Sequence, residues 1–216
     1  MKDYLESLEY DGGKHVDLLL TYFTDKDNVF VFLLRRYLVG AVARVYEQTQ
    51  NAMLVLDGEQ DLGKSAFARW LTSGLEHPGH FIESNIDTEN KDHTIRLATT
   101  WIWEVGELGS TTSRADRSKL KAFLTRETIC ERKSYGRLPI SKPAITSFIG
   151  TINNDIGFLN DPTGNRRYNP TTLTSINWDY SKNIDVNQVW AEAVDLYKNG
   201  EPWRLKDTEK QKNRIY

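Results

Sequence analysis

The chain has 216 residues, of which 39% are hydrophobic and 27% charged, values that fit one large globular domain or a core with a small helical addition. A formal net charge of −2 excludes a globally basic nucleic-acid binder, so such a role would depend on local basic segments. A single cysteine, Cys130, excludes an intrachain disulfide, and no apolar stretch is long enough to cross a membrane. We therefore expect a cytoplasmic protein with no membrane association.

The first 50 residues have the apolar spacing of helices. This spacing predicts three helices, over residues 1–9, 15–23 and about 27–47. A short continuous apolar run then covers residues 52–56, which is typical of a strand buried on both faces. We therefore expect a helical N-terminal part at 1–50, a candidate oligomerisation collar, and a core at 51–216 that ends in a helix.

Strands and helices alternate after this boundary. Apolar runs predict further strands at residues 81–83, 100–105 and 144–151. Helical spacing predicts helices at residues 64–72, 90–99, 114–126 and 185–199, with a hairpin around Tyr135-Gly136. The alternation predicts an α/β fold with a parallel sheet flanked by helices.

The segment from Gly58 to Ser65 matches the phosphate-loop pattern G-x-x-x-x-G-K-[ST]. Gly58 and Gly63 permit backbone angles that aim amide groups at phosphate oxygens. Lys64 would reach the β- and γ-phosphates of ATP, and the Ser65 hydroxyl would bind Mg²⁺. The alternative is a chance match in a turn, but this segment follows a predicted buried strand and opens a predicted helix, so we expect a P-loop NTPase of the AAA+-like type. We expect three nearby acids to face solvent: Asp57, Glu59 and Asp61.

Two acidic residues follow the strand predicted at 100–105. Glu104, at the strand end, is our candidate for holding Mg²⁺, and Glu107 is our candidate for positioning the attacking water. The usual pattern has two adjacent acids, which this segment lacks, so the alternative is that both are ordinary solvent-exposed residues. We expect Trp101 and Trp103 to pack in the core.

Polar residues also follow the strand predicted at 144–151. Asn153 could sense the γ-phosphate or orient water, because ligands of open α/β sheets lie at the carboxyl ends of strands. Arg166 and Arg167 come after a turn, and an arginine supplied to a neighbour's γ-phosphate typically raises the rate by about 10³–10⁵. The alternatives are an Asn-Asn turn and a solvated arginine pair or an ion pair with Asp161.

Residues 112–142 hold nine Lys or Arg against three Asp or Glu. Within this segment the predicted hairpin carries our candidates for nucleic-acid contact: Arg132, Lys133, Tyr135, Arg137 and Lys142. Basic side chains track a phosphate backbone, and an aromatic ring can stack on a base. The alternative is a solvated basic face supported by ion pairs along a helix.

The order of these segments resembles the virulence-associated protein E family, P-loop proteins of phages and mobile elements that look like relatives of superfamily III viral replicative helicases. The likeness extends from Tyr4-Leu5 to the arginine pair, and the string from Asp161 to Arg167 is its most specific part. The resemblance implies a set of site residues: Lys64 and Ser65 as nucleotide ligands, Glu104 as the Walker B-like acid, Asn153 as the sensor, and an arginine finger in Arg166-Arg167. In the resembling helicases a hairpin before the third strand contacts DNA.

The resemblance also implies a ring, expected to be a hexamer, that hydrolyses ATP and acts on single-stranded or forked DNA during replication of a phage or mobile element. A host or element-encoded replication protein is a further expected partner. Family members are often longer, with a primase-like part before this domain, so the chain could be a fragment, a single-domain product or a reduced member. Two alternatives stay open: a non-motor, ATP-gated interaction or interference module, and a small-molecule P-loop kinase.

Overall fold

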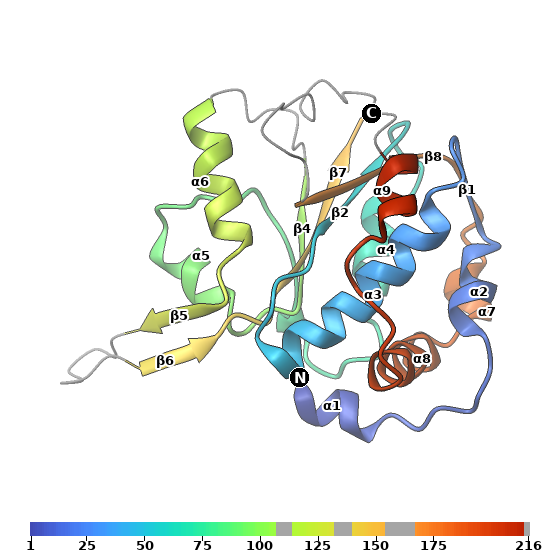
Figure 1. The fold of residues 1–216 in the computed structure, drawn as a ribbon, viewed down its shortest axis with the longest axis horizontal. Coiled ribbons are helices and arrows are strands. Elements are labelled where there is room, and N and C mark those ends of the chain that lie inside the picture. The colour runs from blue at the N-terminus through green and yellow to red at the C-terminus, as the bar shows by residue number, and fades with distance from the viewer. Residues whose placement is uncertain (107–113, 132–139, 154–166, 214–216) are drawn as a thin grey trace.

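The computed structural model describes residues 1–106, 114–131, 140–153 and 167–213, and its centre is a six-stranded sheet in the order β1-β8-β2-β7-β4-β3 (Figure 1). The strands are β1 (Phe23–Asp25), β2 (Met53–Asp57), β3 (Phe81–Glu83), β4 (Ile102–Val105), β7 (Ser147–Ile152) and β8 (Tyr168–Ile176). All neighbours pair in parallel except β1, which pairs antiparallel with β8. The predicted α/β fold with a mostly parallel sheet is therefore confirmed.

Helices flank this sheet, and in Figure 1 α5 and α6 lie on the opposite side of it from α3 and α8. The helices are α1 (Lys2–Ser7), α2 (His15–Leu20), α3 (Phe30–Glu47), α4 (Lys64–Trp70), α5 (Lys91–Arg96), α6 (Arg114–Leu124), α7 (Tyr180–Asn183), α8 (Val186–Lys198) and α9 (Asp207–Lys212). Among the described residues, no helix combines the length and apolar character needed to cross a bilayer.

The side chains of β2 alternate between two hydrophobic cores. Leu54 and Leu56 join the cluster that contains α3, α4 and α8, whereas Met53 and Val55 join the cluster that contains α6. Successive residues of a strand point to opposite faces, so a strand covered on both sides must be apolar at each position. This explains the continuous apolar run that predicts β2.

The helices before residue 50 share a core with the C-terminal helix α8. Glu192 of α8 is buried, and its Oε2 accepts a hydrogen bond of 2.7 Å from the backbone N–H of Val16 at the start of α2. Leu5 of α1 and Leu33 of α3 belong to the same cluster as Trp190 of α8. These contacts attach the N-terminal helices to the α8 side of the sheet, and the division at residue 50 stays a prediction.

The predicted helix at 15–23 is wrong in its last residues. The helix ends at Leu20, and Phe23 begins β1, where it pairs with Ile176 at the end of β8. Asp25 then accepts hydrogen bonds from the backbone N–H groups of Val29 (2.7 Å) and Phe30 (3.1 Å), and so caps α3. Pairing with a strand about 150 residues away therefore outweighs the local apolar spacing.

Strand β8 is not among the predicted strands, because its sequence contains Asn169, Pro170 and several threonines. Proline cannot donate a backbone hydrogen bond and is normally confined to sheet edges. Pro170 pairs with Val55 of β2, but β1 pairs only with the later part of β8, from Leu173 to Ile176. The proline therefore occupies a stretch of β8 that has a partner strand on one side.

The predicted hairpin is present as a separate antiparallel pair. Strand β5 (Thr128–Glu131) pairs with β6 (Ile140–Pro143), and the segment between them, with Tyr135, lies outside the described residues. The pair extends away from the main sheet in Figure 1. Because β6 ends at Pro143 and β7 begins at Ser147, the base of the hairpin lies at the amino end of β7.

Arg44 of α3 is fully buried and holds the base of this hairpin. Its guanidinium donates hydrogen bonds to three backbone carbonyls, those of Leu124 (3.4 Å), Arg126 (2.9 Å) and Ala144 (3.1 Å). The first two carbonyls precede β5 and the third follows β6. One side chain therefore fixes both ends of the hairpin to the longest helix among those described.

Replacing Arg44 with methionine is expected to lower the free energy of unfolding by about 3 kcal/mol, because buried carbonyls lose their donor while the apolar stem is kept. Urea denaturation followed by circular dichroism measures the change. The control is Arg35→Met, whose partly exposed ion pairs with Asp17 and Glu201 should contribute less than about 1 kcal/mol. Equal destabilisation by the two substitutions would contradict the role of Arg44.

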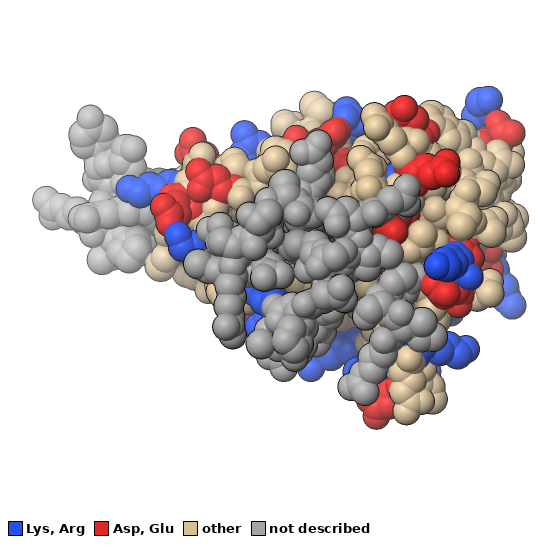
Figure 2. Space-filling view, turned by 90° about the horizontal axis from the view of Figure 1, so that it is seen from above, with Lys and Arg blue, Asp and Glu red and all other residues tan. Residues whose placement is uncertain are grey.

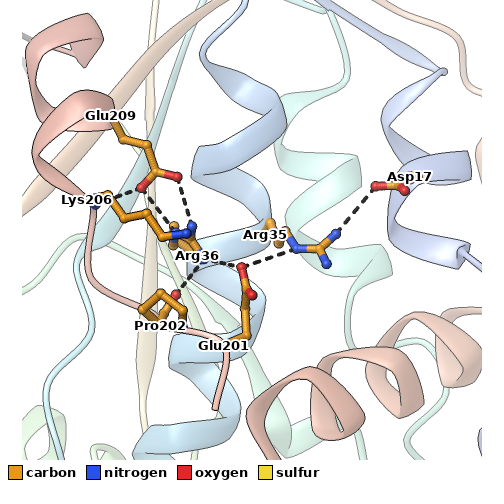
Figure 3. Close-up of polar contacts among 7 residues, drawn as sticks. All are labelled: Asp17, Arg35, Arg36, Glu201, Pro202, Lys206 and Glu209. Atoms are coloured by element: carbon orange, nitrogen blue, oxygen red, sulfur yellow. Dashed lines mark hydrogen bonds and ion pairs between the residues drawn. The ribbon is translucent and has the colours of Figure 1, made fainter. Parts of the chain in front are cut away.

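A second arginine of α3 attaches the C-terminal segment to the fold. Arg36 is 4% exposed and donates to both carboxylate oxygens of Glu209 (3.2 and 2.8 Å), to Glu201, and to the carbonyl of Pro202 (2.7 Å). Figure 3 shows Arg36 between these acceptors and the neighbouring Arg35 directed toward Asp17. The segment after α8 is thus tied to α3 by paired charges.

Candidate functional site

The loop from Gly58 to Ser65 connects β2 to α4, and β2 lies between β7 and β8 in the sheet. Gly58 has φ +146°, and a Cβ there would lie 2.5 Å from the carbonyl oxygen of Leu173. Gly63 has φ +105°, a backbone conformation that side-chain-bearing residues rarely adopt. The conformation of the loop therefore requires both glycines of the motif.

Lys64 is the centre of this loop. Its Nζ donates hydrogen bonds to the carbonyls of Gly58 (2.8 Å) and Glu59 (2.6 Å) and to Oδ1 of Asn153 (3.2 Å), which follows β7. Burial lowers the pKa of the Lys64 ammonium from its ordinary value, and the charge of nearby Asp57 opposes this shift. The loop thus surrounds the Lys64 ammonium, and the side chain of Asn153 contacts the same cation.

Glu104 of β4 is completely buried and faces the same loop. Its Oε1 accepts hydrogen bonds from the hydroxyls of Ser65 and of Thr151 (3.1 Å). Its Oε2 has no hydrogen-bond partner within the described parts of the chain. Burial raises the pKa of the Glu104 carboxyl, which the two hydroxyl donors partly offset. The alternative that Glu104 is an ordinary solvent-exposed residue is therefore wrong.

Asp57 does not face solvent as expected, although Glu59 and Asp61 do. Asp57 is 2% exposed, and its Oδ2 accepts a hydrogen bond of 3.1 Å from the hydroxyl of Thr172. As the last residue of β2, Asp57 lies in the interior of the sheet, between β7 and β8. The site therefore contains two buried carboxyl groups, at the ends of β2 and β4.

The sequence gives no clear signal for the two threonines at this end of the strands. Thr151 is the penultimate residue of β7, and Thr172 pairs with Asp57 across β2 and β8. A threonine near the end of a buried strand is a weak signal, because β-branched residues are common throughout strands. Only the strand order shows that each hydroxyl meets a carboxylate.

Arg167 lies at the opposite end of the strands from the phosphate loop, where β8 begins. It precedes β8, and its carbonyl accepts a hydrogen bond of 2.8 Å from the N–H of Met53 at the start of β2. The phosphate-loop motif begins after the end of β2, about 13 Å further along the strand. Nε of Arg167 is buried and has no hydrogen-bond partner among the residues that the structure describes. Arg167 therefore lies far from the phosphate loop of its own chain. Its role toward the nucleotide of a neighbouring subunit stays a prediction.

Six of the predicted site residues lie outside the described residues, namely Glu107, Arg132, Lys133, Tyr135, Arg137 and Arg166. Lys142 is half-buried on β6, near the amino end of β7 and thus at the opposite end of the sheet from the loop. In Figure 2, which views the molecule from above, basic and acidic side chains are interspersed over the described part of this face. Nucleic-acid contact by the hairpin stays a prediction.

Comparison with known proteins identifies the family. The sequence matches the virulence-associated protein E-like domain over residues 5–215. The chain belongs to this family. The virulence-associated protein E-like domain thus covers nearly the whole chain, from α1 to α9. This confirms the resemblance found in the sequence.

Solved structures are similar to this virulence-associated protein E-like domain in fold. An apo structure of the NrS-1 C-terminal region matches 98% of the chain with a TM-score of 0.59 and 18% identity. An A-form apo structure of the same region matches 97% with a TM-score of 0.59 and 17% identity. The domain covers 51% and 53% of those two chains, about half their length. A search of curated proteins gave no match.

Proposed function

We propose that this chain is an AAA+-like P-loop ATPase domain that binds ATP with Mg²⁺ at residues 58–65 and hydrolyses it. The observation that supports this most directly is the convergence of a lysine, a serine, a buried carboxylate and an amide at the carboxyl ends of adjacent parallel strands: Lys64, Ser65, Glu104 and Asn153. Ligands of open α/β sheets bind at this edge, where the strand order reverses. The crossovers from β2 to β3 and from β7 to β8 place such a reversal beside β2.

The residues present fit a magnesium ion. Mg²⁺ prefers oxygen ligands and is bound through one or two carboxylates together with substrate phosphates. The buried Oε2 of Glu104 lacks a hydrogen-bond partner among the described residues, and the Ser65 hydroxyl contacts Oε1 of the same carboxylate. When bound, the ion would neutralise charge on the phosphates and orient them for attack. Ser65 and Glu104 are the residues that would hold it.

Lys64 and Asn153 supply the remaining polar groups. The Lys64 ammonium now donates to two neutral loop carbonyls, and phosphate oxygens are stronger acceptors because they carry charge. A triphosphate would therefore replace those carbonyls and open the loop around the lysine. Asn153, which contacts the same ammonium, would then lie beside the terminal phosphate and orient it or the attacking water.

We further propose a ring, expected to be a hexamer, that acts on single-stranded or forked DNA during replication of a phage or mobile element. Arg167 and the base of the β5–β6 hairpin both lie at the amino ends of the parallel strands, opposite the phosphate loop. An arginine in this position can act on a nucleotide only when it is presented to a neighbouring subunit. Membership of the virulence-associated protein E-like family supports the same assignment.

The decisive experiment measures the ATPase rate with and without single-stranded DNA, and the molar mass in solution with and without Mg-ATP. We expect ATP hydrolysis, stimulation by DNA that weakens steeply with added salt, and a mass increase to that of a ring on nucleotide binding. A strict monomer without DNA stimulation would contradict the motor. Phosphate transfer to a small-molecule acceptor would instead support the kinase alternative.

A further inference from the structure

Trp178 is an exposed aromatic residue beside the proposed nucleotide site. Its side chain is 55% exposed, whereas the other five tryptophans are buried or half-buried. An exposed aromatic ring beside a polar site offers a flat face on which a ligand can pack. Trp178 lies between the end of β8 and the start of α7.

The indole of Trp178 is fixed against the phosphate loop. Its Nε1–H donates a hydrogen bond of 3.1 Å to the carbonyl of Leu62. A Cβ on Gly63 would lie 2.9 Å from the ring, so the indole packs directly on that glycine. The carbonyl of Trp178 accepts a hydrogen bond of 2.9 Å from the Ser181 hydroxyl, which holds the backbone of this turn. The exposed ring is therefore held in one position before any ligand binds.

The strand order places this ring on the side of the loop away from the terminal phosphate. Glu104 and Asn153, which would contact Mg²⁺ and the γ-phosphate, come from β4 and β7 on one side of β2. Trp178 follows β8, which lies on the other side of β2. A triphosphate whose terminal phosphate lies by β7 would extend its remaining part toward β8 and this indole.

We infer that Trp178 is the stacking platform for the nucleobase of the bound nucleoside triphosphate, an assignment that rests on the proposed function. The single N–H of the indole is already bonded to Leu62, so the ring offers the base only its aromatic face. Every nucleobase has an aromatic face, so stacking strengthens the binding of any nucleotide relative to a phosphate chain that carries no base. Stacking does not distinguish adenine from guanine. The contact explains why a large aromatic ring is kept exposed at this turn.

The test is calorimetric titration of ATP, GTP and inorganic tripolyphosphate, each with Mg²⁺, into the full chain and two variants. Trp178→Ala should weaken ATP and GTP binding by about 10-fold and leave tripolyphosphate binding unchanged, while Trp178→Phe should retain most of the affinity. Equal weakening of all three ligands by Trp178→Ala would mean that the ring only supports the loop, which overturns the inference and leaves the proposed function intact. If neither ATP nor tripolyphosphate binds the unmodified chain, both are overturned.

Tryptophan fluorescence gives a second measurement that does not depend on the stability of the alanine variant. ATP should quench the emission of the unmodified chain more than tripolyphosphate does, because a stacked base lies against the indole. Trp178→Phe should remove this difference, and Trp203→Phe, at a half-buried tryptophan near the C-terminus, should keep it. A difference that persists in Trp178→Phe would overturn the inference.

Discussion

Substitution of Lys64 by alanine is expected to reduce ATP hydrolysis by at least about 100-fold, because a cation that would bind the transferred phosphate is removed from a buried position. The ammonium also holds the carbonyls of Gly58 and Glu59 in the free loop, so the substitution acts on the loop before and after nucleotide binding. Steady-state release of phosphate measures the rate, and titration with Mg-ATP measures the affinity.

The matched control is Lys91→Ala, at an exposed lysine that begins α5. Its ATPase rate and melting temperature should both stay close to those of the unmodified chain. Circular dichroism of the Lys64→Ala variant tests whether the fold is retained. A folded Lys64→Ala variant that hydrolyses ATP at the normal rate would exclude the proposed active site, and one that keeps its biological role without hydrolysis would favour a non-motor module.

Glu104→Gln should lower ATP hydrolysis by about 100-fold while leaving the nucleotide-free domain as stable as before or more stable. The glutamine carbonyl can still accept the hydrogen bonds from Ser65 and Thr151, but the charge that would hold Mg²⁺ is lost. The activity of the variant should therefore respond much less to added Mg²⁺. Titration of the rate against Mg²⁺ concentration measures this effect.

The stability difference between this variant and the unmodified chain should depend on pH with a definite sign. Burial raises the pKa of Glu104, so the folded state keeps a proton at pH values where the unfolded chain has lost it. The contribution of Glu104 to the free energy of unfolding is fully present below the pKa that this carboxyl has in the unfolded chain. It is lost as the pH rises through the higher pKa of the folded state. Glutamine does not titrate, so the melting temperature of Glu104→Gln should exceed that of the unmodified chain increasingly as the pH rises.

Glu83→Gln is the control for both effects. Glu83 pairs with Glu104 across β3 and β4, but its side chain is 47% exposed and forms an ion pair with Arg69. An exposed ion pair contributes little, and the charge of Glu83 raises the pKa of Glu104 less than burial does, so activity and pH dependence should change much less than in Glu104→Gln. If the two substitutions gave the same pH dependence, burial of Glu104 would not be its cause.

The sequence predicts the elements whose apolar pattern is complete within one segment. The strands β2, β4 and β7 are buried along their length and carry mostly apolar residues, and α3 and α8 carry helical spacing. Strand β1 begins within the helix predicted at 15–23, and β8 lacks an apolar pattern because it contains Asn169, Pro170 and several threonines. The pairing of these two strands, across about 150 residues, leaves no mark on the local pattern of either segment.

The residues of the candidate site also divide into those that a local motif predicts and those that depend on a distant strand. The motif around Lys64 is contiguous, so its residues could be named from the sequence, and the expectation that Glu104 and Asn153 join them follows from a parallel sheet. Thr172 and Trp178 could not be named, because they belong to or follow β8, the strand that was missed. Asp57 is expected to face solvent for the same reason, because Thr172, which donates a hydrogen bond to it, belongs to β8.

The attachment of Arg36 has a practical consequence for any attempt to shorten this protein. Both carboxylates that neutralise the guanidinium come from the far end of the chain, at Glu201 and Glu209. A recombinant fragment that stops before position 201 would lose these carboxylates together with the segment that covers the guanidinium, so Arg36 would lose its ion pairs and become accessible to water. Trimming the C-terminus would therefore uncover this part of α3 and leave on it an arginine without its partners.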